Sequence, residues 1–551
     1  MFVNDMKTEF YDVIFDSRVL ILAGFDVDSL CACRILQYLF HCDNILYTLI
    51  PVPGRAALVK AFKQHGEQVK YVIMINCGAT IDVVELLQPK DEVVFYIADS
   101  HRPVDVYNIY NGVQVRLLIK PDDVEGIPEF DNIFREDESE DESDSDIRLN
   151  ERVLERRRER RLWKEQRQKI MFDYTQFSYY GISTAVAMFE LAWKLSKDTN
   201  DLLWWAIVGL TEQYLFRKIE QDKYVLQVGN LQTHVSRHNH ISVRDTNVQS
   251  VTSLRISFEK DLQLALYRHW SLYESLKHTT YTACKFRLWS LKGQKRLCEF
   301  LAEMGLPLVE CKQKFPAMDM HLRNNVIIWF EELAEKYRLD DIVYGSFVGK
   351  HGFRNKFCAA DVVYSTLSLL ETADKESDPT DRFLMALDSL AKKNTDLLLK
   401  GIEMVKLQLT AVFKQVQTIL DLRQLTCSGP YLYAAIEEGL PEAKYFGSPG
   451  RLGMLARFLL QAQYSATKNR RLRNMPLVLA TPSLECVGTS LVVGIPPIAE
   501  ESTKNFFGKA FEQAAHKSRA EVILDYFDTS VVQLRTEDRA KFFDALISLL
   551  S

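Results

Sequence analysis

The architecture of this chain rests on the stretch Val19-Leu20-Ile21-Leu22-Ala23-Gly24-Phe25-Asp26-Val27-Asp28-Ser29. Its first five residues form a continuous apolar run, which is typical of a strand in a parallel sheet that is buried on both faces. Two aspartates follow, and then a stretch of helical composition up to Phe40. Carboxylates at the end of such a strand lie where open α/β sheets bind ligands, and their oxygens suit divalent cations. The same stretch is equally typical of a helix cap, formed by Asp28 or Ser29.

The same alternation continues to about residue 120. Further strands are predicted at residues 45–52, 71–75, 93–98 and 113–119, with helices at 55–65 and 81–87. Strands that alternate with helices predict βαβ units and a doubly wound parallel sheet. Three of these strands end in polar side chains, namely Asp26 and Asp28, Asn76, and Asp99 and His101. Because right-handed crossovers bring such strand ends to one edge, we expect these side chains to lie together.

Composition places the chain among globular proteins. It has 551 residues, of which 47% are hydrophobic and 26% charged, and this length predicts three or four domains. Ten cysteines without a secretory leader predict reduced thiols inside the cell. We see no apolar run of about 18 residues, so no membrane contact is expected. The net charge of −6 provides no overall attraction to nucleic acid.

Two opposed charge blocks follow the predicted sheet. Residues 135–146 contain eight acidic residues and one arginine, which predicts a disordered acidic loop over 135–147. Residues 148–170 are rich in Arg and Glu and predict an exposed basic helix with i,i+4 ion pairs. Within it, Arg156, Arg157 and Arg158 are candidates for a nuclear import signal or for contact with nucleic acid or a partner. A solvated helix face explains them equally well.

Residues 221–345 predict a mostly helical segment. Apolar spacing predicts helices at 262–276, 297–304 and 325–337. His234, His238 and His240 invite a zinc interpretation, but no cysteine or carboxylate stands at ligand spacing, so hydrogen bonding at a helix end is favoured. The aromatic residues between 267 and 289 are expected in the core rather than on a base-stacking surface.

The last third, residues 346–551, predicts a second α/β unit. Strands are expected at residues 431–436, 477–480 and 490–495, with helices starting near residue 505 and at 539–550. The basic cluster of Lys468, Arg470 and Arg471 precedes one of these strands. It is a candidate for phosphate-backbone or partner contact, with a solvated loop as the alternative.

Three motifs resemble those of the DHH phosphoesterase superfamily, which includes the single-strand exonuclease RecJ and family II pyrophosphatases. They are Asp26-x-Asp28, Asn76-x-Gly78 and Asp99-x-His101-x-Pro103. Longer matches, at residues 204–211, 234–240 and 494–497 among others, extend the resemblance to one eukaryotic family of replication factors built on that frame. It implies an α/β fold with a DHH-type domain over 1–220, a helical inter-domain segment over 221–345 and a DHH-associated-type domain over 346–551.

The departures from the catalytic pattern are informative. A two-metal phosphoesterase uses carboxylate and imidazole ligands to hold its ions and activate water. In active relatives a further ligand takes the place of Gly24 or Leu22, a carboxylate that of Asn76 and a histidine that of Ser100. The resemblance therefore implies a vestigial phosphoesterase site with no catalytic residue, metal or cofactor. Its members are Asp26, Asp28, Asn76, Asp99, His101 and Glu212.

The resemblance also implies a function. It is that of a non-catalytic subunit of the eukaryotic replicative DNA helicase, assembled with the minichromosome maintenance ring and the GINS complex and required for initiation and elongation of replication. DNA polymerase epsilon and other replisome factors are further partners, and the location is nuclear, on chromatin during S phase. Single-stranded DNA binding is expected in a cleft between the two α/β units. The alternatives are an active metal-dependent single-strand nuclease or phosphoesterase, and a protein scaffold without nucleic-acid contact. A basic cleft would favour DNA binding, and an acidic or neutral cleft would favour the scaffold.

Overall fold

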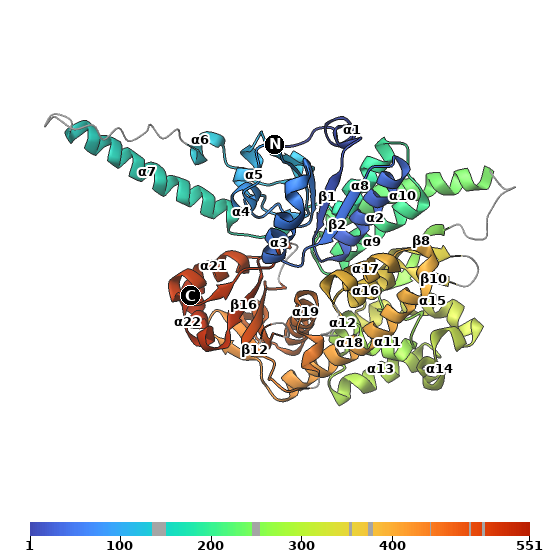
Figure 1. Ribbon diagram of the computed structural model, residues 1–551. Helices are drawn as coiled ribbons and strands as arrows, with labels where there is room; N and C mark the ends of the chain where they lie inside the picture. The colour runs from blue at the N-terminus through green and yellow to red at the C-terminus, as the bar shows by residue number, and fades with distance from the viewer. Residues whose placement is uncertain are drawn as a thin grey trace.

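The computed structural model describes residues 1–134, 150–244, 254–351, 355–372, 378–440, 442–483, 486, 488–498 and 502–551. An N-terminal α/β domain, a helical middle and a C-terminal α/β domain follow one another around the molecule (Figure 1). The α/β class predicted from the sequence is confirmed.

The N-terminal domain is built on a five-stranded parallel sheet in the order β2-β1-β3-β4-β6. Its strands are β1 (Val19–Ala23), β2 (Tyr47–Pro51), β3 (Tyr71–Ile75), β4 (Val94–Ala98) and β6 (Val115–Leu117). The sheet grows outward in both directions from β1 and β3, which is the doubly wound arrangement that the alternation predicted.

Both faces of this sheet are covered because the side chains of β1 alternate. Val19 and Ile21 pack on one face with α2 (Val27–Cys42), α8 (Thr184–Lys194) and α9 (Asn200–Leu215). Leu20 and Leu22 pack on the other face with α3 (Arg55–His65), α4 (Val83–Leu87) and α5 (Val106–Tyr110). A strand buried on both faces explains why its sequence is apolar without a polar alternation.

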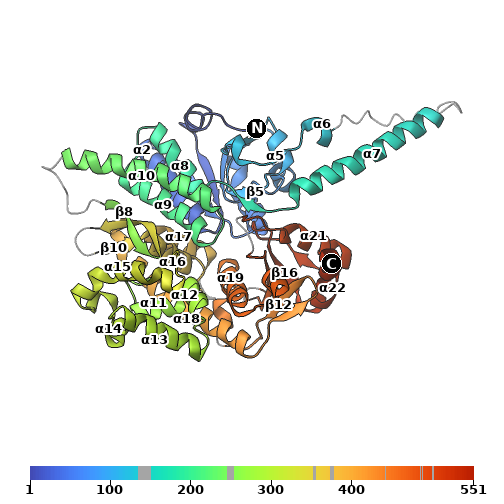
Figure 2. The same cartoon turned by 180° about the vertical axis from the view of Figure 1, so that it is seen from behind.

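The basic helix predicted over 148–170 is present as α7 (Asn150–Thr175), which projects from the body of the protein in both views (Figures 1 and 2). Arg158 is exposed on it. The side chains of Arg156 and Arg157, and the acidic loop predicted at 135–147, lie outside what the structure describes. Between α7 and α8, β7 (Tyr179–Tyr180) pairs with β5 (His101–Arg102) beside the sheet.

The middle of the chain is helical but contains a small sheet. Antiparallel strands β8 (Leu254–Leu262), β9 (Val343–His351) and β10 (Asn355–Cys358) stand between α10 (Gln221–Arg244) and α16 (Ala359–Leu370). The helices between β8 and β9 are α11 (Leu272–His278), α12 (Thr280–Phe286), α13 (Leu291–Glu303), α14 (Leu308–Lys312) and α15 (Met320–Tyr337).

The helix predicted at 262–276 is wrong. The chain leaves β8 at Leu262, runs through a turn in which Leu266 has φ 55°, and becomes helical only at Leu272. A leucine in the left-handed region is incompatible with a continuous helix. Leu264, Leu266 and Tyr267 are buried, so core packing of a loop produced the apolar spacing that resembled a helix.

The division predicted after residue 345 falls inside β9, whose pairing with β8 runs from Val343 to His351. After β10, α16, α17 (Pro379–Ser389) and the first half of α18 (Thr395–Asp421) pack into the core of the N-terminal domain. The second half of α18 packs with the helical middle and the C-terminal sheet. One 27-residue helix thus connects two hydrophobic cores.

The C-terminal domain contains a six-stranded mixed sheet in the order β11-β12-β13-β14-β16-β15. Its strands are β11 (Thr426–Ser428), β12 (Tyr431–Ala435), β13 (Leu477–Pro482), β14 (Thr489–Ile495), β15 (Val522–Ile523) and β16 (Val531–Arg535). Helix α19 (Pro449–Ala466) covers one face, and α21 (Phe507–Ser518) and α22 (Arg539–Leu550) cover the other. The strands predicted at 431–436, 477–480 and 490–495 are confirmed as β12, β13 and β14.

The C-terminal domain is fastened to the N-terminal one at two places. In the loop between β15 and β16, Asp525 accepts hydrogen bonds at the start of α3, from the Ala56 N–H to its Oδ1 (2.7 Å) and from the Arg55 N–H to its backbone oxygen (2.8 Å). Ser178 and Asn505 exchange two backbone hydrogen bonds of 2.8 and 2.7 Å. These contacts hold the two sheets on opposite sides of one cavity.

Short elements complete the fold: α1 (Asp12–Ile14), α6 (Phe130–Ile133) and α20 (Arg470–Arg473). None of the helices that the structure describes is long and apolar enough to span a lipid bilayer.

Candidate functional site at the edge of the parallel sheet

The polar ends of β1, β3 and β4 meet at one edge of the N-terminal sheet, as the sequence predicted. Asp26, Asn76, His101 and Glu212 all line a cavity of about 330 Å³ between the two α/β domains. Asp28 and Asp99 lie directly behind them and are only 2% and 4% exposed. The six residues predicted as a vestigial site are therefore brought together.

Asp26 ends the turn after β1 and begins α2. Its Oδ1 accepts the Ser29 N–H at 2.7 Å, and its Oδ2 accepts the Ser29 hydroxyl at 3.0 Å. This is the hydrogen bonding of a helix N-cap. A cap is present as one interpretation predicted, but its residue is Asp26 rather than Asp28 or Ser29.

Asp28 is fully enclosed by the start of α8. Its carboxylate accepts hydrogen bonds from the Ser183 hydroxyl (2.5 Å), from the Thr184 N–H (2.8 Å) and from the Ala185 N–H (3.0 Å). Burial, and then the neighbouring Asp26 carboxylate, raise the pKa of Asp28, while the hydrogen bonds from Ser183 and Ala185 oppose that rise. Asp28 thus serves as the tertiary cap of α8, which fixes that helix to the sheet.

Asn76 connects the two aspartates. Its Nδ2 donates to Asp26 (3.2 Å) and to Asp28 (3.1 Å). Its Oδ1 accepts the Ser100 backbone N–H at 2.9 Å and the Thr184 hydroxyl at 2.6 Å. Because a backbone N–H can only donate, the Ser100 contact fixes the amide so that its NH₂ group faces the carboxylates.

Asp99 and His101 form a second pair, in which Asp99 is buried and His101 reaches the cavity. Asp99 Oδ2 accepts the N–H groups of Gly78 and Ala79 (3.0 and 2.9 Å), and its Oδ1 lies 2.7 Å from His101 Nδ1. Burial alone would raise the pKa of Asp99, but the positive charge of His101 and these hydrogen bonds outweigh it and hold that pKa below its usual value. The Asp99 carboxylate correspondingly raises the pKa of His101 against the effect of burial.

Glu212 lies near the end of α9, and its partner was not predicted from the sequence. Lys218 Nζ donates to Glu212 Oε1 at 2.7 Å and lies 4.9 Å from the centre of the Tyr180 ring. The helix ends at Leu215 with Phe216 as its C-cap, and Arg217 takes the left-handed conformation (φ 53°). The Lys218 N–H then returns to the Gln213 carbonyl. This turn is a common helix terminator, and it directs residue 218 back toward residue 212.

The donor set does not fit a two-metal centre. The oxygens of Asp26, Asp28 and Asp99 already accept protein N–H or O–H groups, and the Asn76 amide presents hydrogens rather than an oxygen. Divalent hard cations need oxygen lone pairs directed at them. Among the described residues, no group of three or more His, Cys, Asp and Glu is arranged to hold a metal ion.

The position of the missing ligand before Asp26 is closed as well. A Cβ atom at Gly24 would lie 2.5 Å from the backbone oxygen of Asn76. Leu22, the other position where relatives of the superfamily carry a ligand, is completely buried in the core. The backbone of this sheet edge therefore excludes a side chain at residue 24.

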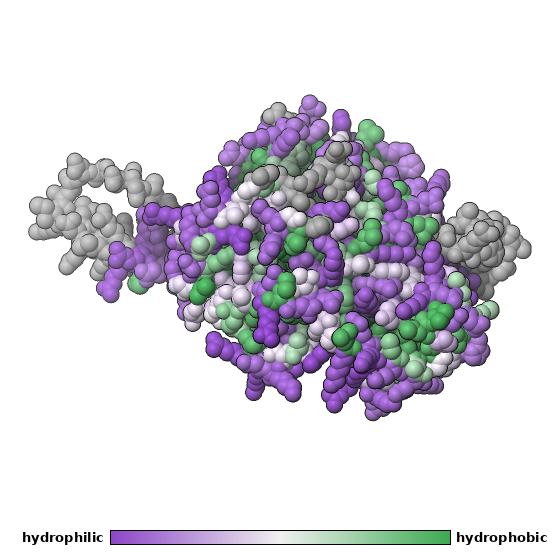
Figure 3. Space-filling view, turned by 90° about the horizontal axis from the view of Figure 1, so that it is seen from below, coloured by the Kyte–Doolittle hydropathy of each residue, from purple (hydrophilic) through white to green (hydrophobic). Residues whose placement is uncertain are grey.

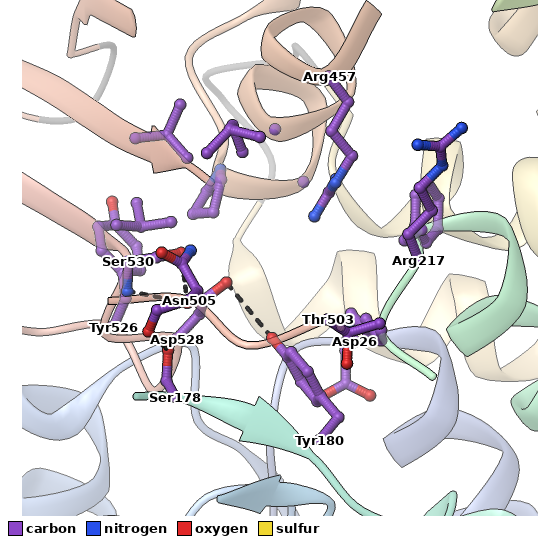
Figure 4. A pocket seen from close by; sticks show the side chains of 18 of the residues that line it. Asp26, Ser178, Tyr180, Arg217, Arg457, Thr503, Asn505, Tyr526, Asp528 and Ser530 are labelled. Carbon is purple, nitrogen blue, oxygen red and sulfur yellow. Dashed lines mark hydrogen bonds between the residues drawn. The ribbon is translucent and has the colours of Figure 1, made fainter. Parts of the chain in front are cut away.

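The cavity wall has balanced charge. Its described lining holds four acidic side chains and four basic ones: Asp26, Glu212, Glu371 and Asp528, and Arg217, Lys218, Arg382 and Arg457. Arg457 on α19 and Arg217 approach from the side opposite Tyr180 and Asp26 (Figure 4). The Tyr180 hydroxyl on β7 donates to Asp528 in the loop between β15 and β16 at 3.3 Å, so this hydrogen bond joins the two domains across the cavity wall.

The remaining candidates lie elsewhere. Lys468, Arg470 and Arg471 are exposed around α20 and do not line the cavity. His238 Nε2 lies 3.0 Å from Asp198 Oδ2, just before the start of α9. His234 packs edge-on against Phe189 and Trp193, and the side chain of His240 is outside the described part. The favoured hydrogen-bonding interpretation of the histidines therefore agrees with the structure at His238.

This doubly wound sheet, with Asp26-x-Asp28, Asn76 and Asp99-x-His101 at its strand ends and a second α/β domain across the cavity, is the DHH-type arrangement that the sequence resemblance predicted. Comparison with known proteins narrows the class. The family model CDC45 matches residues 19–146 and 120–549, and the chain belongs to the CDC45 family.

Individual relatives agree with this assignment. The cell division control protein 45 homolog of Homo sapiens is 50% identical over 566 residues that cover 100% of both chains. The homolog of Schizosaccharomyces pombe is 28% identical and covers 96% of this chain and 95% of its own. The crystal structure of CDC45 from Entamoeba histolytica covers 100% of both chains with a TM-score of 0.72 at 23% identity, so the fold is shared. Family membership supports a role in DNA replication.

Proposed function

We propose that this protein is a non-catalytic subunit of the eukaryotic replicative DNA helicase, assembled with the minichromosome maintenance ring and the GINS complex. It uses the DHH-type frame as a scaffold in both initiation and elongation of replication. DNA polymerase epsilon and other replisome factors are further partners. The protein is then expected in the nucleus, on chromatin during S phase.

The observation that carries the proposal is the occupation of the site by the protein itself. The Asn76 amide and the first N–H groups of α8 take up the carboxylate oxygens that a phosphoesterase directs at metal ions. These hydrogen bonds stabilise the junction between the sheet and α8. The site residues therefore have a structural use that needs no catalysis.

Exposed apolar surface supports a role in protein contacts. Leu291, Val309 and Met320, on α13, α14 and α15, are 79%, 73% and 67% exposed. The face seen from below is largely hydrophilic and carries separate hydrophobic groups (Figure 3). A partner that covered these side chains would remove their apolar surface from water, which is favourable for association.

One variant tests the non-catalytic role. In Asp26→Asn the helix cap is retained, because asparagine caps helices as well as aspartate does, whereas the carboxylate that a phosphoesterase would need for its metal ions is lost. We expect the variant to assemble with the helicase ring and GINS, and to support replication in cells depleted of the wild-type protein, as well as wild type does. Failure of a correctly folded Asp26→Asn protein to do so would contradict the proposal.

The competing nuclease hypothesis has its own test. Labelled single strands are incubated with the wild-type protein and Mn²⁺, with Asp99→Ala as the matched variant. We expect no nucleotide release from either protein. Release that Asp99→Ala abolishes would show an active phosphoesterase.

Single-stranded DNA binding is a second, weaker candidate function. A basic cavity would favour DNA binding and a neutral one a protein scaffold, so the balanced charge of this cavity favours the scaffold. One observation favours DNA, namely that the Arg457 guanidinium, which points into the cavity, has no hydrogen bond or ion pair with another described residue (Figure 4). Burial lowers the pKa of Arg457, so an unpaired charge here is costly without an anion.

The DNA hypothesis is tested by fluorescence anisotropy with a labelled single strand at low salt. We expect Arg457→Ala to weaken binding about tenfold, and the exposed Lys295→Ala on α13 to leave it unchanged. Binding should decrease as salt increases, since phosphate contacts release counterions. Equal binding by the wild type and Arg457→Ala would exclude the cavity as the DNA site.

A further inference from the structure

The acidic cluster at the sheet edge contains a cation that no site motif includes. Lys218 is 17% exposed and Glu212 5% exposed, and their side chains meet at 2.7 Å. Both residues line the cavity together with Asp26. Burial alone would lower the pKa of Lys218, but Glu212, Tyr180 and Asp26 outweigh it and raise that pKa.

This ion pair differs from an ordinary surface pair. Lys223, five residues further on, is 51% exposed and contacts Glu220 at 3.1 Å, which is typical of pairs that contribute little to stability. A carboxylate as buried as Glu212 needs a counter-charge, because an unpaired charge in a protein interior is strongly destabilising. Burial raises the pKa of Glu212, Asp26 and Asp28 add to that rise, and Lys218 opposes it.

Within the described part of the chain, one oxygen of the Glu212 carboxylate is left without a partner beside the lysine. Glu212 Oε2 is buried and has no hydrogen-bond partner among the described residues. A buried carboxylate with one unpaired oxygen, one ammonium beside it and a second carboxylate on the same cavity wall has the electrostatics of a cation site whose cation belongs to a side chain. The ammonium of Lys218 thus explains how two carboxylates, those of Asp26 and Glu212, can share one cavity wall.

We propose that Lys218 is a resident cation: its ammonium takes the electrostatic place of a divalent metal ion beside Asp26 and Glu212 and thereby excludes metal from the cavity. This inference rests on the proposed non-catalytic function and deepens it. Lost ligands alone would leave the negative charges of Asp26 and Glu212 uncompensated and able to attract a metal ion weakly, whereas the ammonium of Lys218 compensates them. Removal of the ammonium should therefore produce a site for a hard divalent cation with carboxylate ligands.

The experiment uses the full chain and Mn²⁺ alone as the probe. Lys218→Met keeps the length of the side chain and removes its charge, and Lys223→Met is the matched control. The electron paramagnetic resonance signal of free Mn²⁺ should be unaffected by wild type and by Lys223→Met. Lys218→Met should bind one Mn²⁺ per chain at least tenfold more tightly than wild type.

Thermal unfolding provides a second readout. Lys218→Met should melt below wild type without metal and recover with Mn²⁺, while wild type and Lys223→Met should not respond. If Lys218→Met does not fold without metal, the double variant Lys218→Met/Glu212→Gln should fold, because both buried charges are removed, and should not bind Mn²⁺. Failure of the double variant to restore folding would overturn the proposal.

Two other results would also overturn it: Mn²⁺ binding by wild type as tight as by Lys218→Met, or a folded Lys218→Met that does not bind Mn²⁺. Neither result alone contradicts the proposed function. That function fails on a different observation, namely Mn²⁺-dependent release of nucleotides from single strands by wild type.

Discussion

Substitution of Asp28 by alanine distinguishes a structural carboxylate from one kept for catalysis. Four donors would lose their acceptor, namely the Ser183 hydroxyl, the N–H groups of Thr184 and Ala185, and the Asn76 amide. A buried donor left unsatisfied costs about 1–3 kcal/mol, so four at the lower limit amount to about 4 kcal/mol. For a domain of this size that corresponds to a melting temperature lower by roughly 8–16 °C.

The assay is thermal unfolding of the full chain, followed by circular dichroism. The control is Asp319→Ala, which removes the exposed cap of α15, where Asp319 accepts the N–H groups of His321 and Leu322. That change should cost only about 1 kcal/mol. A carboxylate retained for chemistry beside Asp26 would instead be repelled by it, and its removal would stabilise the fold. A melting temperature of Asp28→Ala at or above that of wild type would therefore refute the structural role.

Three further predictions concern the same fold. Gly24→Ala should destabilise the protein by roughly 2 kcal/mol, because the new Cβ would lie 2.5 Å from the Asn76 backbone oxygen; wild-type stability in chemical unfolding would contradict this. Burial and two nearby carboxylates raise the pKa of Asp105 to about 6, so its ionisation destabilises the folded state as pH rises. The free energy of unfolding of Asp105→Asn should therefore rise by about 2 kcal/mol relative to that of wild type between pH 4 and pH 7. A stability difference between the two proteins that does not change with pH would argue against this. Glu371→Ala should cost about 2 kcal/mol in thermal unfolding, since the carboxylate accepts the Gly450 and Arg451 N–H groups at the start of α19; an unchanged melting temperature would exclude that cap.

Local patterns were sufficient for much of the fold and for part of the site. Apolar runs that end in polar residues identified the strands of the parallel sheet, and the rule for right-handed crossovers placed Asp26, Asn76 and Asp99 at one edge. This succeeded because a buried parallel strand has a distinctive composition and its end has a fixed position. The projecting helix α7 was equally predictable from its charge.

Other features depend on tertiary contacts that leave no local signal. Leu264 and Leu266 have helical spacing but lie in a buried loop, so packing overrode the pattern. Lys218 reaches Glu212 only because Arg217 adopts a left-handed conformation, which an arginine in the sequence does not indicate. Three of the four donors to Asp28 come from residues 183–185, more than 150 positions away.

The hydrogen bonds between Asp525 and the start of α3 set an order of events during synthesis. The free N–H groups at residues 55 and 56 belong to the first domain, but their acceptor is made about 470 residues later. In a nascent chain the first N–H groups of α3 therefore lack their protein acceptor until nearly the whole protein has left the ribosome. The two α/β halves mature together, although they are translated far apart in time.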